Sequence, residues 1–319
     1  MLAQTGLALG AAAAGSLTAR GASAAADAKP APASAAKTTP AEPFGYCFNT
    51  STISGQKLGL VEEIEIIARA GYQGIEPWIR ELDAYVKEGG SLSDLGKRLR
   101  DVNLSVESVI GFFDWIVDDD AKRAKALDEA KRNFELVAAI GGKRLAAPPV
   151  GATDIVNFDL NKAADRYGEL LVLGQKAGVT PMVEVWGFSK TLGTLGAALM
   201  VAADCGHAGA SILPDVYHLF KGGSDISGLK LLDGASIGVF HFNDYPANPP
   251  RAEITDAHRV YPGDGVAPIG DLLKILRDIG YRGMLSLEVF NREYWKQDAL
   301  LVASTGLDKM RTIVKKSLA

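Results

Sequence analysis

Hydrophobic positions follow two alternating periods along most of the chain. Short apolar runs, typical of buried strands, are followed by longer segments in which apolar residues recur every three or four positions, typical of amphipathic helices. The predicted strands are Phe44–Phe48, Tyr72–Glu76, Leu104–Ile110, Lys143–Ala147, Thr180–Trp186, Ser211–Val216, Ser236–Phe242 and Met284–Phe290. The predicted helices are Leu58–Ala70, Leu92–Val102, Ala121–Ile140, Leu160–Ala177, Thr191–Cys205, Ile226–Leu232, Ile269–Ile279 and Lys296–Lys315.

This alternation predicts parallel strands joined by helical crossovers. Several helices end at a glycine that an apolar strand follows at once, as at Gly71, Gly178 and Gly280. Eight such units over about 275 residues predict a closed (β/α)8 TIM barrel in a single domain, 44–319. An open, doubly wound sheet is the alternative, because a pattern does not show closure. No G-x-G-x-x-G motif follows the first strand and no P-loop occurs, so nothing indicates a nucleotide site.

The first residues differ from the rest in composition. Leu2 to Leu17 is apolar and rich in small residues, and Ala22 to Ala26 fits a signal-peptidase cleavage site. We therefore expect an export signal over 1–26, resembling the later part of a twin-arginine signal although no Arg-Arg pair is present. Met1 would then be an internal start, and the protein would reach the periplasm. The alternative is a disordered, alanine-rich tail.

Residues 27–43 are rich in Ala, Pro, Lys and Thr and predict a disordered linker. The apolar stretch before it is too short to span a membrane, so we expect no stable membrane insertion once the signal is removed.

The composition of the chain excludes several kinds of partner and site. The chain of 319 residues is 47% hydrophobic and carries a net charge of -4, which argues against nucleic acid as a partner. The two cysteines, Cys47 and Cys205, allow one disulfide but no disulfide framework. Four histidines in total exclude a metal site built mainly from histidine.

Four consecutive predicted strands in the second half carry an ionisable residue at or near their ends. They are Glu184, Asp215, His241 and Glu288. A charged group at a buried strand end is costly unless something compensates it, and one divalent cation would compensate all four. Three carboxylates and one imidazole suit Mn²⁺ first, and also Mg²⁺, Co²⁺ or Zn²⁺. The sequence thus predicts a metal site at the carboxyl ends of the strands, where barrel enzymes place their active sites.

Other residues at the same rim are candidates for contacting a substrate. His218 is placed to reach a substrate oxygen or to polarise a carbonyl. Glu76 would orient a hydroxyl or pair with a lysine, and Glu107 is a candidate to support the site from outside. An apolar wall for a sugar face is expected from four aromatic residues: Trp186, Trp78, Phe112 and Phe113.

A long loop, 243–268, follows the seventh predicted strand. A loop of this length beside an expected site indicates a lid or a substrate clamp. Arg251 and Arg259 lie in it, and either would bind a carboxylate or a phosphate. The sequence does not choose between them.

Several short motifs carry a resemblance to the sugar phosphate isomerase/epimerase family, the xylose isomerase-like TIM barrels. In order along the chain they are Ala70-Gly71-Tyr72-Gln73-Gly74-Ile75-Glu76, Val183-Glu184, Asp215-x-x-His218, His241-Phe242-Asn243-Asp244, Tyr261-Pro262-Gly263-Asp264-Gly265, Gly280-Tyr281-Arg282-Gly283 and Leu287-Glu288. The resemblance covers about Phe44 to Ala319. It implies the barrel, a small-molecule carbohydrate substrate and one divalent ion on the four residues above. A homo-oligomer is one possible state, and the sequence does not identify the oligomeric state.

The resemblance also implies chemistry. In the family's ketose epimerases two glutamates, matching Glu184 and Glu288, move a proton at the carbon next to a carbonyl through an enediolate, and the histidine matching His218 contacts substrate. The epimerase arginine expected a few residues after His241 has no counterpart, since Tyr245, Pro246 and Ala247 stand there.

This departure leaves a second interpretation open, a lyase or dehydratase acting on a keto-inositol, dehydroshikimate or a 3-keto-glycoside. Two further classes are a non-catalytic sugar-binding protein and an apurinic-site endonuclease. The endonucleases need more histidines than this chain has.

Overall fold

A computed structural model describes residues 42–319. The predicted signal peptide and all but the last two residues of the predicted linker lie outside this range, so both remain predictions. None of the helices in the described range is long and apolar enough to cross a membrane. Cys47 and Cys205 are both free thiols, so the two are not paired.

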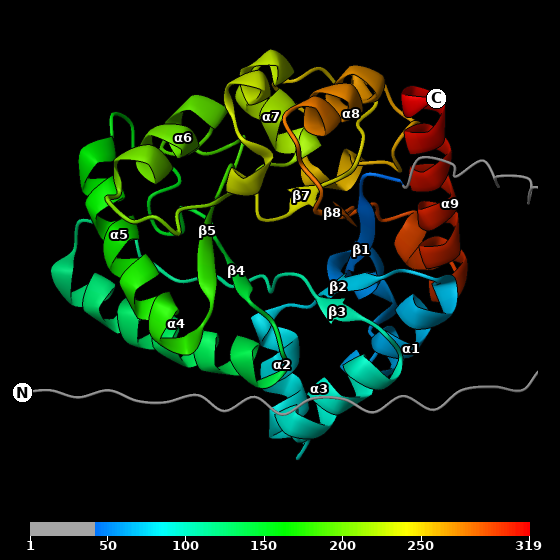
Figure 1. Ribbon diagram of the computed structural model, residues 1–319, viewed down its shortest axis with the longest axis horizontal. Coiled ribbons are helices and arrows are strands. Elements are labelled where there is room, and N and C mark those ends of the chain that lie inside the picture. Colours follow the sequence, from blue (N-terminus) through cyan, green and yellow to red (C-terminus); the bar gives the residue numbers. More distant parts are fainter. Residues whose placement is uncertain (1–41) are drawn as a thin grey trace, which may run out of the picture. The chain divides into compact units, whose positions relative to one another are not determined.

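Eight parallel strands are surrounded by helices (Figure 1). The strands are β1 Gly45–Asn49, β2 Gly74–Glu76, β3 Ser105–Val106, β4 Arg144–Ala147, β5 Thr180–Glu184, β6 Ile212–Leu213, β7 Phe240–His241 and β8 Met284–Leu287. Pairing is continuous in the orders β3-β2-β1-β8-β7 and β4-β5-β6. Single parallel bridges join the two groups, from Val109 to Leu145 and from Ile212 to Ile237. The strands therefore close on themselves, which confirms the predicted (β/α)8 TIM barrel over the open sheet.

The helices follow the strands on the outside of the barrel. They are α1 Leu60–Ala70, α2 Ile79–Lys87, α3 Leu92–Asp101, α4 Asp120–Ala139, α5 Leu160–Ala177, α6 Leu195–Asp204, α7 Val216–Gly222, α8 Ile269–Asp278 and α9 Ala299–Leu318. Side-chain caps explain where several begin: Asp119, Asp159 and Asp298 each accept a backbone N–H in the first turn. Gly71 ends α1 and Gly178 ends α5 in the left-handed conformation that glycine adopts at little cost.

Two predicted elements are wrong in kind. Residues Ile226–Leu231 form the short 3-10 helix η2 rather than an α-helix. The crossover helix after β6 is α7, whose first residue, Val216, was expected to end a strand. Its β-branched and aromatic residues resemble a strand, but the Oδ1 atom of Asp215 caps the helix by accepting the N–H of His218 at 2.8 Å. Helix α2, directly after β2, was missed.

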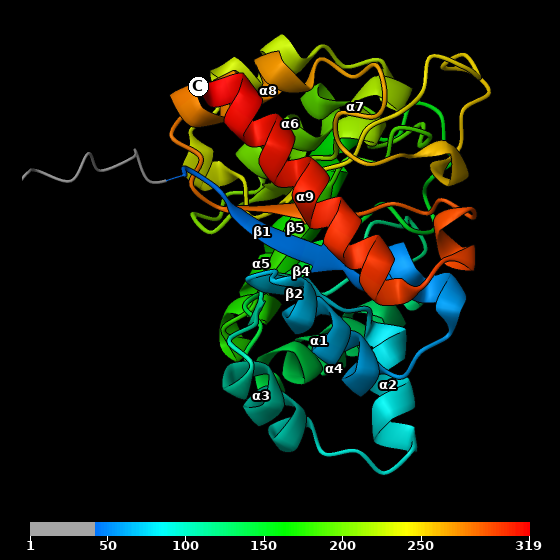
Figure 2. The same ribbon diagram turned by 90° about the vertical axis from the view of Figure 1, so that its right-hand side faces the viewer.

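The remaining short helices lie in the loops. They are η1 Thr50–Gln56, η3 Gly234–Ser236, η4 Asp256–His258 and η5 Tyr294–Lys296. In Figure 2 the loops after β7 and β8 extend beyond one end of the barrel, on the right of the view. This is the carboxyl end of the strands, and η4 and η5 belong to these loops.

Candidate functional site

The candidate site forms because side chains two residues apart on a strand share a face. Met182, Leu213 and Val239 pack together in a small apolar cluster. Each of these residues is followed, two positions later in the chain, by a predicted ligand: Glu184, Asp215 or His241. The ligand side chains therefore point to the same inner face of the barrel as the apolar cluster. They lie closer to the carboxyl ends of the strands. Bulky apolar residues below and polar residues above are the arrangement expected at the mouth of such a barrel.

Three of the four predicted ligands form a compact group. In Asp215, His241 and Glu288, atoms able to bind a metal all lie within 4.8 Å of one another, and all three residues are buried. The Nδ1 atom of His241 lies 3.1 Å from Oε2 of Glu288 and 3.7 Å from Oδ2 of Asp215. Glu184 stands outside this compact group but lines the same cavity as Glu288. The structure thus brings the predicted quartet to one place.

Two buried atoms of the quartet fit a cation in particular. Among the described residues, Nδ1 of His241 and Oε2 of Glu184 have no hydrogen-bonding partner. Buried polar atoms of native proteins nearly always have one, and both of these atoms are ordinary metal ligands. The group as a whole therefore fits a divalent ion held by oxygen and nitrogen.

Glu76 contacts the other side of the His241 ring. Its Oε2 atom lies 3.1 Å from Nε2 of His241, and the Ser286 hydroxyl donates to the same oxygen. A hydrogen bond at Nε2 fixes the orientation of the ring, so that Nδ1 faces Asp215 and Glu288. Burial acts to lower the pKa of His241, but the carboxylates of Glu288 and Glu76 outweigh it and raise that pKa well above its ordinary value, so a metal bound at Nδ1 would displace a proton. Glu76 is fully buried beneath the ring, and among the described residues it pairs with His241 and not with a lysine.

Arg259 brings a positive charge into the acidic site. Its side chain is 1% exposed, and its Nη1 atom donates to Oδ2 of Asp215 and to Oε2 of Glu288, both at 2.9 Å. Its Nη2 atom donates to Asp256 in η4 and lies 3.0 Å from Nε2 of His218. A carboxylate oxygen has lone pairs enough to serve both an N–H donor and an ion. Arg259 is therefore compatible with a bound cation and offsets one of the three carboxylate charges.

The surrounding protein groups shift the pKa values of the two glutamates of the site in opposite directions. Burial raises the pKa of Glu184 to about 8, with the charges of Glu288 and Asp215 adding to the rise. Burial also acts to raise the pKa of Glu288, but His241 and Arg259 outweigh it and lower that pKa to about 2. A pair of carboxyl groups whose pKa values are pushed apart is the arrangement that acid/base catalysis requires.

His218 lies on α7 at the wall of the same cavity, next to Arg259. Burial and the neighbouring charges of Arg259 and His241 lower its pKa well below the ordinary value, so the imidazole is neutral.

The cavity at the barrel mouth has a volume of about 580 Å³. Of the predicted contacts, Glu184, Glu288, His218, Trp186, Trp78, Phe112 and Arg259 line it. Three other candidates lie elsewhere. Phe113 is buried in the outer core, Glu107 lines a hollow with Arg144 at the other end of the strands, and the exposed Arg251 is absent from the lining.

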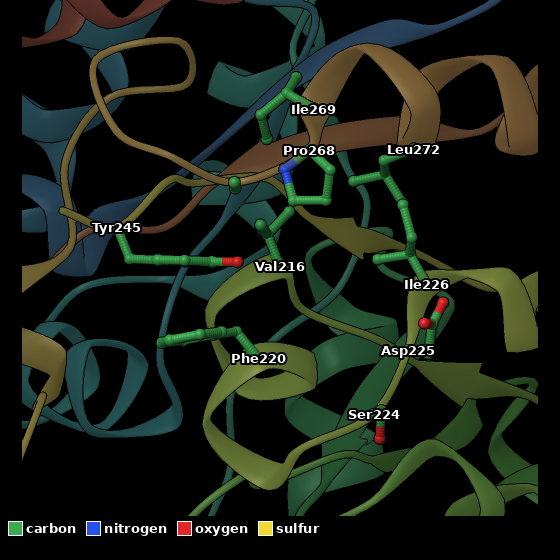
Figure 3. Close-up of a pocket in the computed structure, with 10 residues that line it drawn as sticks. Val216, Phe220, Ser224, Asp225, Ile226, Tyr245, Pro268, Ile269 and Leu272 are labelled. Carbon is green, nitrogen blue, oxygen red and sulfur yellow. The ribbon is translucent and has the colours of Figure 1, made fainter. Parts of the chain in front are cut away.

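A second cavity, of about 200 Å³, lies between α7 and α8 (Figure 3). Its lining is mostly apolar, and Phe220 stacks on Tyr245 with ring centroids 4.0 Å apart. The charged residue in the lining, Asp225, is exposed and caps η2. This cavity lacks the convergent ionisable groups of the barrel mouth.

Asparagines were missed as members of the site. Nδ2 of Asn243 donates to Oδ2 of Asp215 at 2.8 Å, and Nδ2 of Asn49 donates to Oε1 of Glu288 at 3.1 Å. Both residues are fully buried. Asn49 directly follows a predicted strand, and Asn243 lies two residues after His241. Their positions next to strand ends could therefore have identified them as site residues.

Comparisons with known proteins agree with this geometry. The family model described as xylose isomerase-like TIM barrel matches residues 64–313. An inosose isomerase of Bacillus velezensis is 28% identical over 276 residues, which cover 85% of this chain and 97% of the relative. A 3-dehydroshikimate dehydratase of Pseudomonas putida is 26% identical over 269 residues, and the match spans 81% of this chain but only 40% of that protein.

Solved structures show the same fold. A crystal structure of a protein called IolI, with a binding zinc atom, superposes with a TM-score of 0.80 at 24% identity and covers 86% of this chain and 99% of its own. An L-ribulose 3-epimerase superposes with a TM-score of 0.70 at 18% identity, over 86% of this chain and 95% of its own.

Proposed function

The chain belongs to the xylose isomerase-like TIM barrel family and is an enzyme of that superfamily, and we propose that it is a metal-dependent isomerase or epimerase of a keto sugar or a related polyol. The observation that carries the proposal is that Glu184 and Glu288 line one cavity, and that Glu288 forms a buried group with Asp215 and His241 in which atoms able to bind a metal lie within 4.8 Å of one another. Relatives named as inosose isomerases and a structural neighbour named as a ketose epimerase support the substrate class.

The two glutamates perform the proton transfers. One glutamate would remove the proton from the carbon next to the carbonyl, and the other would return a proton to the enediolate. His218 lines the same cavity and would hold a substrate oxygen. The buried Arg259 also keeps Glu288 ionised and so able to accept a proton, although it lowers the basicity of that carboxylate.

A divalent ion would be held by Glu184, Asp215, His241 and Glu288, and when bound it supplies Lewis-acid stabilisation of the negative charge that develops on the substrate oxygens. Mn²⁺ suits the oxygen-rich donors, and Mg²⁺ and Co²⁺ suit them too. Zn²⁺ belongs in the test as well, because the crystal structure of IolI contains a bound zinc atom.

A lyase or dehydratase is the second candidate. It begins with the same proton removal and then expels a leaving group from the next carbon. The observation that favours it is the similarity to 3-dehydroshikimate dehydratases. The two reactions share every residue named above and differ in their products.

Solvent-proton exchange tests the proposal directly. The purified protein, loaded in turn with Mn²⁺, Mg²⁺, Co²⁺ and Zn²⁺, is incubated in deuterium oxide with scyllo-inosose, 3-dehydroshikimate and a panel of ketoses, and exchange is followed by NMR. Glu288→Gln is the test variant and Glu293→Gln, an exposed glutamate of the same loop, is the matched control.

We expect exchange in the wild type and in the control, and a loss of at least about 100-fold in Glu288→Gln. Exchange without a change in product mass identifies an isomerase or epimerase, and loss of water identifies a dehydratase. No exchange with any of these substrates and metals would refute the proposal.

The N-terminal sequence supports a separate proposal, that the protein is exported to the periplasm. Sequencing the N-terminus of the protein recovered from the native periplasm tests it. Cleavage between residues 22 and 27 supports export, and recovery only from the cytoplasm with Met1 intact contradicts it.

A further inference from the structure

The cavity that contains the two glutamates is lined toward its mouth by aromatic side chains. Five of them form a chain of neighbouring rings whose successive centroids lie 5.1 to 6.3 Å apart, in the order Phe290, Trp78, Phe112, Trp186 and Phe188. They come from the ends or following loops of β2, β3, β5 and β8. These five residues are here called the aromatic arc.

Two members of the arc expose much of their surface. Phe112 is 46% exposed and Phe188 is 43% exposed. Exposed aromatic surface that lines a cavity commonly marks a site where a ligand packs. Phe112 and Phe188 both contact Trp186, so these three rings form a connected apolar part of the cavity that Glu184 also lines.

The cavity is larger than a monosaccharide requires. At about 580 Å³ it falls in the range of pockets that hold drug-sized ligands, roughly 300–1,000 Å³. A keto hexose or inosose, with twelve non-hydrogen atoms, would occupy only the floor, next to the glutamates. The space beside the aromatic arc is then available for a substituent on the sugar ring.

Few polar side chains beside the arc are free to bind the hydroxyls of a second sugar. On the facing η4 segment, Asp256 accepts from Arg259 and Thr255 contacts His258 at 2.9 Å. Arg259 is itself held by Asp215 and Glu288. Among the described residues of the lining, Arg292 is the cation without an ion pair, and it is exposed. This lining suits an apolar planar group better than a phosphate or a second sugar.

We propose that the aromatic arc is a subsite for a planar aromatic group attached to the sugar ring, so that the substrate is a keto sugar bearing an aryl aglycone. Aromatic rings stack against such a group in offset or edge-to-face geometry and gain affinity beyond that of burial alone. This inference rests on the proposed function for the sugar end of the ligand. The arc itself would be a specificity element and takes no part in proton transfer.

Binding of three glucosides tests the inference with the metal-loaded protein. Phenyl, cyclohexyl and methyl β-D-glucopyranoside share one sugar, carry no carbonyl and so undergo no turnover. Their dissociation constants are measured by isothermal titration calorimetry for the wild type, Phe112→Ala and Phe188→Ala. Leu231→Ala, which removes an 87% exposed side chain on η2, is the matched control.

We expect the phenyl glucoside to bind at least about tenfold more tightly than the methyl glucoside, with the cyclohexyl glucoside in between. This ratio should fall several-fold in Phe112→Ala or Phe188→Ala and stay unchanged in Leu231→Ala. If an alanine variant does not fold, Phe188→Leu replaces it, since leucine keeps the bulk and removes the planar ring.

Equal binding of the three glucosides would overturn the inference. So would equal binding of the phenyl and cyclohexyl glucosides, or a phenyl preference that survives in both phenylalanine variants. The proposed function stands or falls separately, because solvent exchange into a keto sugar is measured on the wild type without any aryl group.

Discussion

The Oε2 atom of Glu76 lies 3.1 Å from Nε2 of His241, so a carboxyl group of β2 fixes the orientation of an imidazole on β7. The opposite ring atom, Nδ1, has no hydrogen bond within the described part of the chain and faces Asp215 and Glu288. Carboxyl groups behind a ligating histidine hold its tautomer and increase its basicity. Glu76 should therefore affect metal affinity rather than substrate recognition.

Replacing Glu76 tests this role. Glu76→Gln keeps the shape but removes the negative charge behind the ring, and we expect the affinity for Zn²⁺ or Co²⁺ to fall by about 10- to 100-fold. The measurement is competition with a chromogenic chelator. Glu107→Gln, which changes a glutamate at the other end of the strands, should bind metal like the wild type. Unchanged affinity in Glu76→Gln would show that the contact does not support the site.

Arg259 should stabilise the fold as well as the site. It is a buried cation between Asp215 and Glu288, and removing one partner of a buried ion pair costs about 3–5 kcal/mol. We expect Arg259→Met to lower the free energy of unfolding by about that amount, measured by urea denaturation with a chelator present.

The other arginine of the same loop is the control. Arg251 is exposed and makes no ion pair among the described residues, so Arg251→Met should change the free energy of unfolding by less than about 0.5 kcal/mol. Equal effects of the two substitutions would mean that the buried ion pairs of Arg259 add nothing to stability.

The barrel could be predicted from sequence because the units alternate an amphipathic helix with a short apolar strand, several helices end at a glycine, and these signals are local. The quartet could be predicted too, since strand ends meet at one edge of a parallel barrel. The choice of Arg259 over Arg251 could not. It depends on how a long loop folds back over the mouth, which no periodicity encodes. The position of Glu76 beneath His241 likewise depends on two strands that are far apart in the sequence.

Helix α7 shows a different limit. Val216 and Tyr217 favour a strand by their propensity, but the cap from Asp215 begins a helix there. One residue thus caps a helix through Oδ1 while its Oδ2 faces Arg259 and Asn243.

Lys221 holds the loop that carries Arg259 and η4. Its Nζ atom donates to the backbone carbonyls of Arg251, Ala252 and Ile254 at 2.9 to 3.0 Å. Hydrogen bonds from a charged group contribute about 1.5–3 kcal/mol each when they replace bonds to water favourably. We expect Lys221→Met to speed amide hydrogen exchange in residues 251–259 by about tenfold or more, because local opening becomes easier.

Hydrogen exchange with mass spectrometry measures the effect, and Lys230→Met, at an exposed position in η2, is the control. Because the loop lines the cavity through Asp256 and Arg259, the KM of Lys221→Met should also rise. Wild-type exchange rates in Lys221→Met would mean that the three contacts do not hold the loop.

Glu63 should make the stability of the barrel depend on pH. This residue of α1 is 3% exposed, and its Oε2 atom has no partner within the described residues. Burial, with a further contribution from the charge of Glu81, raises its pKa to about 9. In the unfolded chain Glu63 loses its proton near its ordinary pKa of about 4.3, whereas the folded protein retains it up to about pH 9.

Between these two values the unfolded chain binds fewer protons than the folded one, so the free energy of unfolding falls as pH rises, by up to about 1.4 kcal/mol per pH unit. Glu63→Gln keeps the side-chain shape and does not ionise. Relative to the wild type, it should therefore gain stability steadily from pH 5 to pH 9, as measured by urea denaturation. The exposed neighbour variant Glu62→Gln should follow the wild-type curve. Glu184 titrates in both proteins, so its contribution cancels in the difference between their free energies of unfolding. If the free energies of Glu63→Gln and the wild type depend on pH in the same way, Glu63 is not held protonated by the fold.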